Sequence, residues 1–185
     1  MAELTTVSFG PQHPVLPEPI HLDLELKDEK VVRAVPSIGY VHRGLEKLVE
    51  KRDFKQFIYV AERVCGICSH AHTTAYCMAI ERLLGVEVPL RAQYIRVMFD
   101  EITRILNHLL NIGTHGLDIG AMTMVLYTFR EREDLMDAYE AVSGARLHAA
   151  YYRPGGVYRD LPEQMPKYQQ NKFKDAATVS KLNSA

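Results

Sequence analysis

The chain has 185 residues, of which 47% are hydrophobic, and its formal net charge at pH 7 is -1. A chain of this length and apolar content can bury one sizeable core, so we expect a single domain. The near-neutral charge argues against nucleic acid as a partner, because phosphate binding calls for a basic excess on one face.

The apolar residues and the cysteines both indicate the cellular compartment of the chain. No uninterrupted apolar run approaches the roughly 18 residues of a membrane span, and no charged-then-apolar leader opens the chain. The three cysteines do not form a disulfide framework, which agrees with a reducing compartment. We therefore expect a cytosolic chain without a transmembrane helix.

Three short segments near the N-terminus alternate apolar and polar residues, as half-buried strands do. They cover residues 5–9, 20–26 and 31–35, and the charged turn at 27–30 joins the last two. We expect a small antiparallel sheet within a region that ends at residue 36. The fold class that follows is α+β and mainly α, because helical spacing dominates the rest of the chain.

The segment 10–19 between the first two expected strands contains four prolines. Proline excludes helix and central strand, so this segment is predicted to be a stiff, extended loop. It carries His13 and Glu18, which such a loop can hold over a site. The alternative is a proline-rich surface loop with a solvated histidine.

Apolar residues recur at helical spacing after Pro36, which predicts a helical core over 37–161 and a polar tail over 162–185. The expected helices cover 45–61 with a charged interruption at 50–53, then 75–84, 89–109 and 121–142. Gly85 and Gly144 fit helix ends.

Two local details of these helices are also predicted. Asp100 stands four residues before Arg104, a spacing at which opposite charges pair on a helix. The two glycines of Gly113-Thr-His-Gly116 indicate a break before the last helix.

The strongest chemical signal is Glu62-Arg-Val-Cys-Gly-Ile-Cys-Ser-His-Ala-His72. Two thiols separated by two residues can bind one metal, and Gly66 lets the backbone between Cys65 and Cys68 bend tightly. Disulfides, redox pairs and zinc sites share this spacing, and a structural zinc site normally needs two further ligands. A simple packing pair is a further alternative.

The extended pattern from Arg63 to His72 resembles the N-terminal active-site motif of nickel-iron hydrogenase large subunits. This resemblance implies that Cys65 and Cys68 bind metal and that Glu62, Glu18 and His72 are candidate proton relays. The resemblance implies that a complete nickel-iron centre is held by four cysteines, the second pair of which lies near the C-terminus. This chain has no such pair, so we expect a fragment of a longer subunit.

The later half resembles the D subunit of respiratory complex I, a recognised relative of the hydrogenase large subunits. The matching segments are 89–108, 114–123, 129–133 and 143–156. The resemblance implies that Arg43 and His148 lie beside an iron-sulfur cluster of a neighbouring subunit. It also aligns Asp118 with an aspartate that hydrogen-bonds a quinone-site histidine. His148 as a core side chain and Asp118 as a helix N-cap are the alternatives.

The two resemblances disagree about chemistry at the motif. The D subunit of complex I usually has an aspartate-tyrosine pair where Cys65-Gly66 stands, and the tyrosine meets the quinone headgroup. It also tends to carry a second histidine, four residues after the one matching His13, where this chain has Pro17. Thiolates suit nickel and iron better than they suit a quinone.

We therefore predict a terminal electron-accepting subunit that passes electrons from an iron-sulfur partner to protons at a nickel-iron site. The alternatives are a quinone-reducing D subunit of NADH-quinone oxidoreductase and a non-catalytic scaffold. The expected partners are an iron-sulfur small subunit of the B type, a C-type partner and membrane subunits, at the cytoplasmic face of the cell membrane. Two geometric predictions are that the Cys65 and Cys68 sulfurs lie about 3.5 to 4 Å apart and that Arg43 approaches His148.

Overall fold

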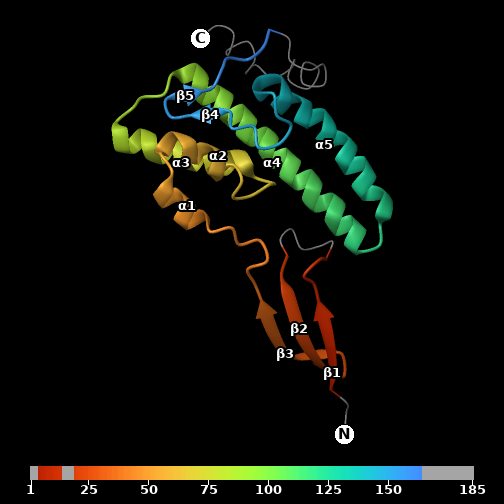
Figure 1. The fold of residues 1–185 in the computed structure, drawn as a ribbon. Helices are drawn as coiled ribbons and strands as arrows, with labels where there is room; N and C mark the ends of the chain where they lie inside the picture. Colours follow the sequence, from red (N-terminus) through yellow and green to blue (C-terminus); the bar gives the residue numbers. More distant parts are fainter. Residues whose placement is uncertain (1–3, 14–18, 164–185) are drawn as a thin grey trace.

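The computed structural model describes residues 4–13 and 19–163. The elements in chain order are β1 (Thr5–Phe9), β2 (His21–Lys27), β3 (Lys30–Ser37), α1 (Leu45–Lys51), α2 (Phe54–Ala61), α3 (Ser69–Leu84), α4 (Leu90–Asp118), α5 (Met122–Ser143), β4 (Tyr152–Arg153) and β5 (Gly156–Val157). The small N-terminal sheet followed by helices confirms the predicted α+β, mainly α class (Figure 1).

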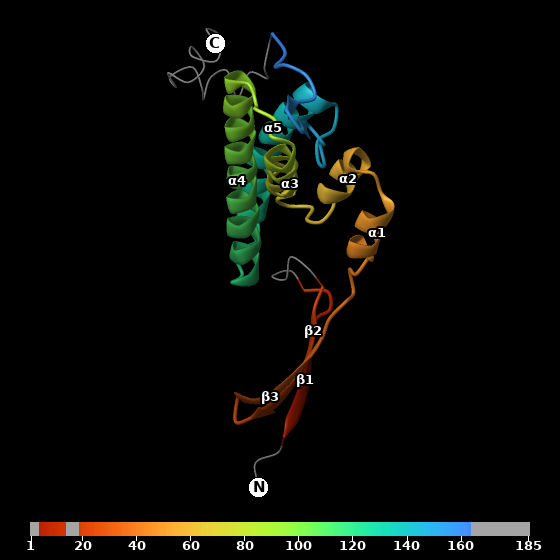
Figure 2. The same ribbon diagram turned by 90° about the vertical axis from the view of Figure 1, so that its left-hand side faces the viewer.

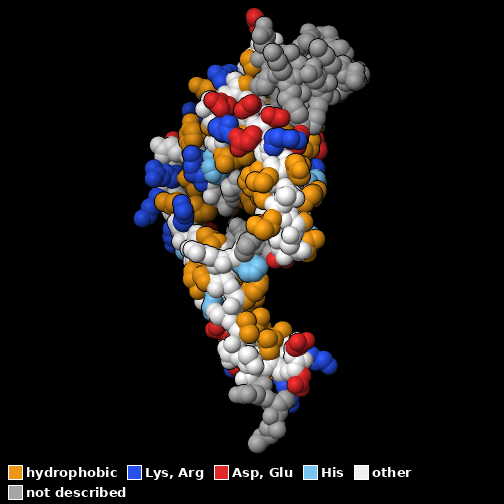
Figure 3. Space-filling view, turned by 90° about the vertical axis from the view of Figure 1, so that its right-hand side faces the viewer, with side chains coloured by type: hydrophobic (Ala, Val, Ile, Leu, Met, Phe, Trp, Pro, Cys, Tyr) orange, Lys and Arg blue, Asp and Glu red, His pale blue; other side chains and the backbone are white. Residues whose placement is uncertain are grey.

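The N-terminal sheet is antiparallel in the order β1-β2-β3. Leu24 pairs with Val7 on one side and with Ala34 on the other. No described residue of its three strands is buried, and β3 is exposed along its whole length. The sheet therefore adds nothing to the core and forms a narrow extension below the helical body (Figure 3).

The helical body is built on α4 and α5, which run side by side in opposite directions (Figure 1), with α3 and α2 on another side of α4 (Figure 2). Its core is formed by fully or nearly fully buried apolar side chains from these helices and from the segment after α5. They include Cys77, Ile95, Phe99, Ile102, Leu106, Tyr139, Val142, Tyr151 and Tyr152.

The predicted helix break at 113–116 is wrong, because α4 continues through both glycines to Asp118. A Cβ at Gly113 would lie 2.2 Å from Thr128 Oγ1, and one at Gly116 would lie 3.0 Å from Met124 Cβ. These glycines therefore let α4 and α5 approach closely. They serve packing between helices and do not end a helix.

Two further local predictions are also wrong. Asp118 is the last residue of α4 and is exposed, while Ala121 holds the N-cap position of α5, so Asp118 is not a helix N-cap. Asp100 accepts hydrogen bonds from Thr74 and Tyr152. Arg104 pairs with Glu101 instead, at 3.0 Å.

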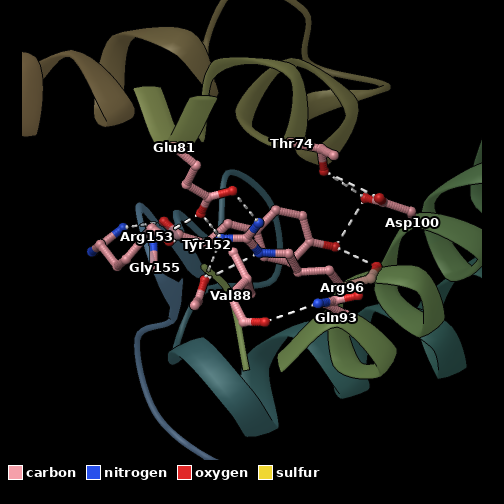
Figure 4. A network of polar contacts seen from close by, with 10 residues as sticks. Thr74, Glu81, Val88, Gln93, Arg96, Asp100, Tyr152, Arg153 and Gly155 are labelled. Atoms are coloured by element: carbon pink, nitrogen blue, oxygen red, sulfur yellow. Dashed lines mark hydrogen bonds and ion pairs between the residues drawn. The ribbon is translucent and has the colours of Figure 1, made fainter. Parts of the chain in front are cut away.

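The β4-β5 hairpin is fastened to α3 and α4 by a buried polar network (Figure 4). The Arg96 guanidinium pairs with the Glu81 carboxylate at 2.6 Å, and both side chains are only 8% exposed. Arg96 also donates to the carbonyls of Arg153 and Gly156, and the Gly155 amide donates to Glu81. This network fixes the segment after α5 against α3 and α4.

Candidate functional site

Three side chains of the kinds that can bind a metal come together in the loop between α2 and α3 and the first turn of α3. One ligand atom each from Cys65, Cys68 and His72 lies within 4.8 Å of the other two, and all three side chains are half-buried. Cys68 is the N-cap residue of α3, and His72 follows it by one helical turn, so both lie on the same face of the helix. The Cys68 Sγ and the His72 Nε2 are 3.5 Å apart. We refer to these three residues as the thiol-imidazole cluster.

The third cysteine lies elsewhere. Cys77 is completely buried in the hydrophobic core, and burial raises the pKa of its thiol to about 11. A thiol in that environment stays protonated and is a poor ligand. The described residues therefore offer two thiols to a metal at this site.

Glu62, the C-cap residue of α2, begins the loop that carries the cluster and is fully buried. Its Oε1 accepts a hydrogen bond from Thr73 Oγ1 at 2.8 Å. Its Oε2 is buried and has no hydrogen-bond partner in the described structure. A buried carboxyl oxygen without a partner is energetically costly, and a catalytic role is one explanation for such a group.

His70 is a second fully buried polar group on the same face of α3 as Thr73. Desolvation lowers the pKa of His70 from 6.5 to about 4, against the opposing effect of the Glu62 charge, so the ring is neutral near pH 7. Its Nδ1 lies 3.4 Å from Thr103 Oγ1, which itself donates to the Phe99 carbonyl. Nδ1 therefore carries the proton, and Nε2 is a buried acceptor without a partner in the described structure.

His148 supports the cluster loop from the segment after α5. Its Nδ1 donates to the Glu62 carbonyl at 2.8 Å, although the two residues are 86 positions apart. Its backbone has a left-handed φ of 53°, which is costly for a residue with a side chain. The ring also lies 3.9 Å from where a Cβ at Gly66 would stand. A larger side chain at position 66 would therefore meet His148 directly.

The other predicted site residues are distributed as follows. The His13 ring stacks on Phe9 at the end of β1, with centroids 4.3 Å apart. Glu18 lies outside the described residues. Arg43 is exposed in the loop before α1, and Asp118 is exposed at the end of α4. The approach of Arg43 to His148 stays a prediction.

The donor set can be compared with the nickel-iron centre that the motif implies. The motif resemblance implies that four cysteines hold such a centre, whereas the described residues bring two thiols and one imidazole to this point. Two soft thiolates and a nitrogen ligand suit a thiophilic metal ion. The described residues do not fit a complete nickel-iron centre.

Sequence reasoning misses the buried polar residues behind the cluster. His70 carries no specific prediction, and no pattern singles out Thr73 or Thr103, yet Thr73 donates to Glu62 and Thr103 lies within hydrogen-bond distance of His70. The spacing of His70 and Thr73 places them on one helix face, but only the packing of α4 and α5 shows that this face is buried.

In the part of the chain that the structure describes, no helix is long and apolar enough to cross a bilayer.

Comparison with protein families yields two matches. Residues 43–143 match the family described as nickel-dependent hydrogenase. Residues 118–182 match the family described as the respiratory-chain NADH dehydrogenase 49 Kd subunit. The first match contains the thiol-imidazole cluster, and the second begins at the end of α4.

Curated relatives match along the whole chain, and the three that follow are each named as the D subunit of NADH-quinone oxidoreductase. The protein from Azoarcus sp. (strain BH72) is 70% identical over 187 residues, covering 100% of this chain and 45% of the relative. The proteins from Aromatoleum aromaticum and Alkalilimnicola ehrlichii are 68% and 60% identical, covering 99% and 97% of this chain but 44% and 43% of their own lengths. The chain thus spans less than half the length of these relatives. The chain belongs to the nickel-dependent hydrogenase family, whose model matches more than half of it, and is similar along its whole length to D subunits of NADH-quinone oxidoreductase.

Proposed function

We propose that this chain is part of the electron-accepting subunit of a quinone-reducing complex of the NADH-quinone oxidoreductase type. The observation that supports this most is the 70% identity, across the entire chain, to a relative named as the D subunit of that complex. It favours quinone as the acceptor over the protons at nickel that the motif indicates. Electrons would come from an iron-sulfur partner, as the resemblance to the D subunit of complex I implies.

Quinone reduction to quinol consumes two electrons and two protons, so the site must supply both. The side chains proposed to move protons are Glu62 beside the cluster and His72 within it, with His13 and Glu18 on the 10–19 loop. Glu62 is the best placed of the described acids, because its carboxyl group is fully buried and one of its oxygens has no partner in the described structure. A buried acid of this kind is suited to proton transfer in a site that excludes water.

The partners follow from the same proposal. Arg43 and His148 are assigned to the surface that meets the iron-sulfur small subunit, where a cation or hydrogen-bond donor raises a cluster's reduction potential. A C-type partner and membrane subunits would complete the complex at the cytoplasmic face of the membrane. The Asp118 side chain, exposed at the end of α4, is then free to face such a partner.

The proposal is tested by replacing the resident D subunit of a bacterial complex with the product of the complete gene that contains this chain. Isolated membranes are then assayed for NADH-dependent quinone reduction. We expect inhibitor-sensitive activity that survives Cys65→Ser and Cys68→Ser but falls by about 10²-fold or more in Glu62→Gln. An assembled complex that reduces no quinone would refute the proposal.

Hydrogen turnover is the second candidate, and two observations favour it. The sulfurs of Cys65 and Cys68 lie within 4.8 Å of each other, and residues 43–143 match the hydrogenase family. The same membranes are therefore assayed for hydrogen uptake with an artificial electron acceptor and analysed for nickel. Hydrogen uptake that depends on Cys65, with nickel bound, would replace the quinone proposal. Assembly without either activity would indicate the scaffold alternative.

A further inference from the structure

A groove with a volume of about 460 Å³ lies between α2, the C-terminal end of α3 and the β4-β5 hairpin. We call it the Arg153 groove. We propose that it binds a small amphiphilic carboxylate of the fatty-acid class, with the carboxylate on Arg153 and the hydrocarbon chain against the apolar wall. The proposal goes beyond the proposed function, because the ligand is not a quinone and the groove shares no residue with the thiol-imidazole cluster.

The wall of the Arg153 groove is mostly apolar. The side chains that form this wall are Phe54, Ile58, Tyr59, Leu84, Val86 and Pro154. Leu84 is 60% exposed and Val86 is 42% exposed. Single exposed apolar side chains are common on proteins, but a group of them that lines one hollow is typical of a binding site. The volume of the groove also lies within the range of about 300 to 1,000 Å³ that pockets for small ligands have.

The charged side chains of the groove are both cations. Lys55 and Arg153 line it together with one neutral polar residue, and no acidic residue does. In the part of the chain that the structure describes, neither cation forms an ion pair with a carboxylate. A hollow with apolar walls and charge of one sign attracts a ligand that has an apolar body and the opposite charge. A neutral quinone would leave both cations without a counter-charge.

The Arg153 guanidinium is held in one orientation. Its Nη1 donates to the backbone carbonyls of Ala150 and Tyr152. Its Nη2 donates to the Tyr59 hydroxyl at 3.3 Å, and its central carbon lies 5.3 Å from the Tyr59 ring centroid and 5.4 Å from that of Tyr158. The fixed guanidinium therefore loses little side-chain freedom when it binds an anion.

These contacts also leave a specific pair of donors. In the described structure the Nε hydrogen of Arg153 and the second Nη2 hydrogen make no hydrogen bond. These two hydrogens lie on one edge of the guanidinium, and a carboxylate accepts such a pair through both of its oxygens. The free edge of Arg153 therefore favours a carboxylate as the head group, and the nearby Lys55 adds a second positive charge.

The binding experiment titrates the 185-residue chain with decanoate, below its micelle concentration, by isothermal titration calorimetry. Decyltrimethylammonium has the same hydrocarbon chain with a cationic head, and acetate has the same head without the chain. We expect one decanoate per chain and at least about 10-fold weaker binding of both other probes. Equal binding of decanoate and decyltrimethylammonium would show unspecific adsorption and overturn the proposal.

A partner protein is the other possible occupant of an apolar groove with two cations. A short synthetic peptide of leucine and glutamate is therefore titrated in parallel. If this peptide binds and decanoate does not, the groove is a docking surface for an acidic protein segment and the proposal is wrong. Absence of decanoate binding in the folded chain would refute the proposal in the same way.

Variants place the ligand in the groove. Leu84→Ser should weaken decanoate binding by about 10-fold or more, because it removes apolar area from the wall. Its control is Leu126→Ser on α5, at a leucine that is 70% exposed and lies outside the groove. Lys55→Gln should weaken binding by about 2- to 5-fold, whereas Lys51→Gln, at an exposed lysine outside the groove, should have no effect.

Arg153→Lys tests the head group, because lysine keeps the charge but lacks the pair of donors. We expect about 10-fold weaker binding of decanoate or more. Far-ultraviolet circular dichroism checks that each variant is folded. If folded Leu84→Ser and Lys55→Gln bind decanoate as tightly as the wild type, the groove is not the site. This result is independent of the membrane assay, because decanoate binding is measured on the chain alone and quinone reduction on the assembled complex.

Discussion

Two groups of buried polar side chains lie close together in the helical body, and they differ in how completely their hydrogen bonds are satisfied. In the first, Arg96 and Glu81 pair with each other and with the backbone of the β4-β5 hairpin (Figure 4). In the second, Glu62 and His70 each keep one buried atom without a hydrogen-bond partner in the described structure. The first group fastens the fold together, and the second lies behind the thiol-imidazole cluster.

This difference in hydrogen bonding distinguishes residues that stabilise the fold from residues that we assign to the functional site. Proteins satisfy nearly all buried polar groups, so each exception needs an explanation, and we assign those of Glu62 and His70 to function. A satisfied ion pair should affect stability strongly when one partner is removed. Unsatisfied groups should affect stability little when they are replaced by neutral side chains, and should affect activity instead.

The largest expected effect comes from breaking the first group. Arg96→Leu leaves the Glu81 carboxylate buried without its cation, and we expect a loss of about 3 to 5 kcal/mol of unfolding free energy. Urea unfolding followed by circular dichroism measures this loss. The matched control is Arg104→Leu, because Arg104 forms an exposed pair with Glu101 and its removal should leave the urea midpoint unchanged. Equal midpoints for the two variants would show that the Arg96 network does not stabilise the fold.

The second prediction concerns pH and the second group. The pKa of His70 is lowered from 6.5 to about 4 in the folded chain, so the unfolded chain binds a proton more readily across this interval. Stability should therefore fall as the pH drops from about 6.5 to about 4, by at most about 3 kcal/mol. The neighbouring hydroxyls of Tyr139 and Tyr152 stay neutral throughout, because burial raises their pKa.

The control for this pH dependence is His70→Gln, which keeps an amide donor for Thr103 but does not titrate. Metal-free protein is used, so that metal binding does not contribute to the pH dependence. The variant should lose less stability than the wild type over the same interval. Identical pH profiles would show that His70 is not a buried neutral histidine.

A smaller effect is expected at the boundary of the two groups. The Tyr152 hydroxyl donates to the Asp100 carboxylate and lies 2.9 Å from both Asp100 Oδ1 and the Arg96 carbonyl oxygen. Tyr152→Phe removes this donor while keeping the ring, and we expect a loss of about 1 to 3 kcal/mol, measured by urea unfolding. Tyr158→Phe, at a residue that is 63% exposed, is the control and should leave stability unchanged.

The smallest expected change in stability is that of Glu62→Gln. Glutamine keeps an oxygen for the Thr73 hydroxyl and carries no charge, so unfolding free energy should change by less than about 1 kcal/mol. A loss comparable to that of Arg96→Leu would mean that Glu62 belongs to the scaffold. The two groups would then both serve stability, and the proposed difference between them would be wrong.

Much of the fold follows from local pattern. The alternation of residues 5–9 predicts β1, and Gly85 and Gly144 mark the ends of α3 and α5, because these signals act within a few residues. The break expected at 113–116 is wrong for the opposite reason. The need for glycine there comes from Thr128 and Met124 on α5, which local pattern does not show.

The site likewise has features that local spacing predicts and features that depend on distant segments. The spacing of Cys65 and Cys68 predicts that these two thiols converge, because they are separated by only two residues. His72, which the motif resemblance makes a candidate proton relay, joins them because it lies one turn after Cys68 on α3. The partner of His148 and the burial of His70 depend on α4, α5 and the segment after them, so no motif predicts them. Asp100 illustrates the same point, since its partners Thr74 and Tyr152 lie 26 and 52 residues away.

The measurement that tests the central claim most directly is NADH-dependent quinone reduction by membranes carrying Glu62→Gln, compared with Tyr152→Phe. Both variants should assemble. Glu62→Gln should lose about 10²-fold or more of the activity while keeping its stability, whereas Tyr152→Phe should lose stability and keep its activity per assembled complex. Wild-type activity in Glu62→Gln would contradict the assignment of the second group to the functional site.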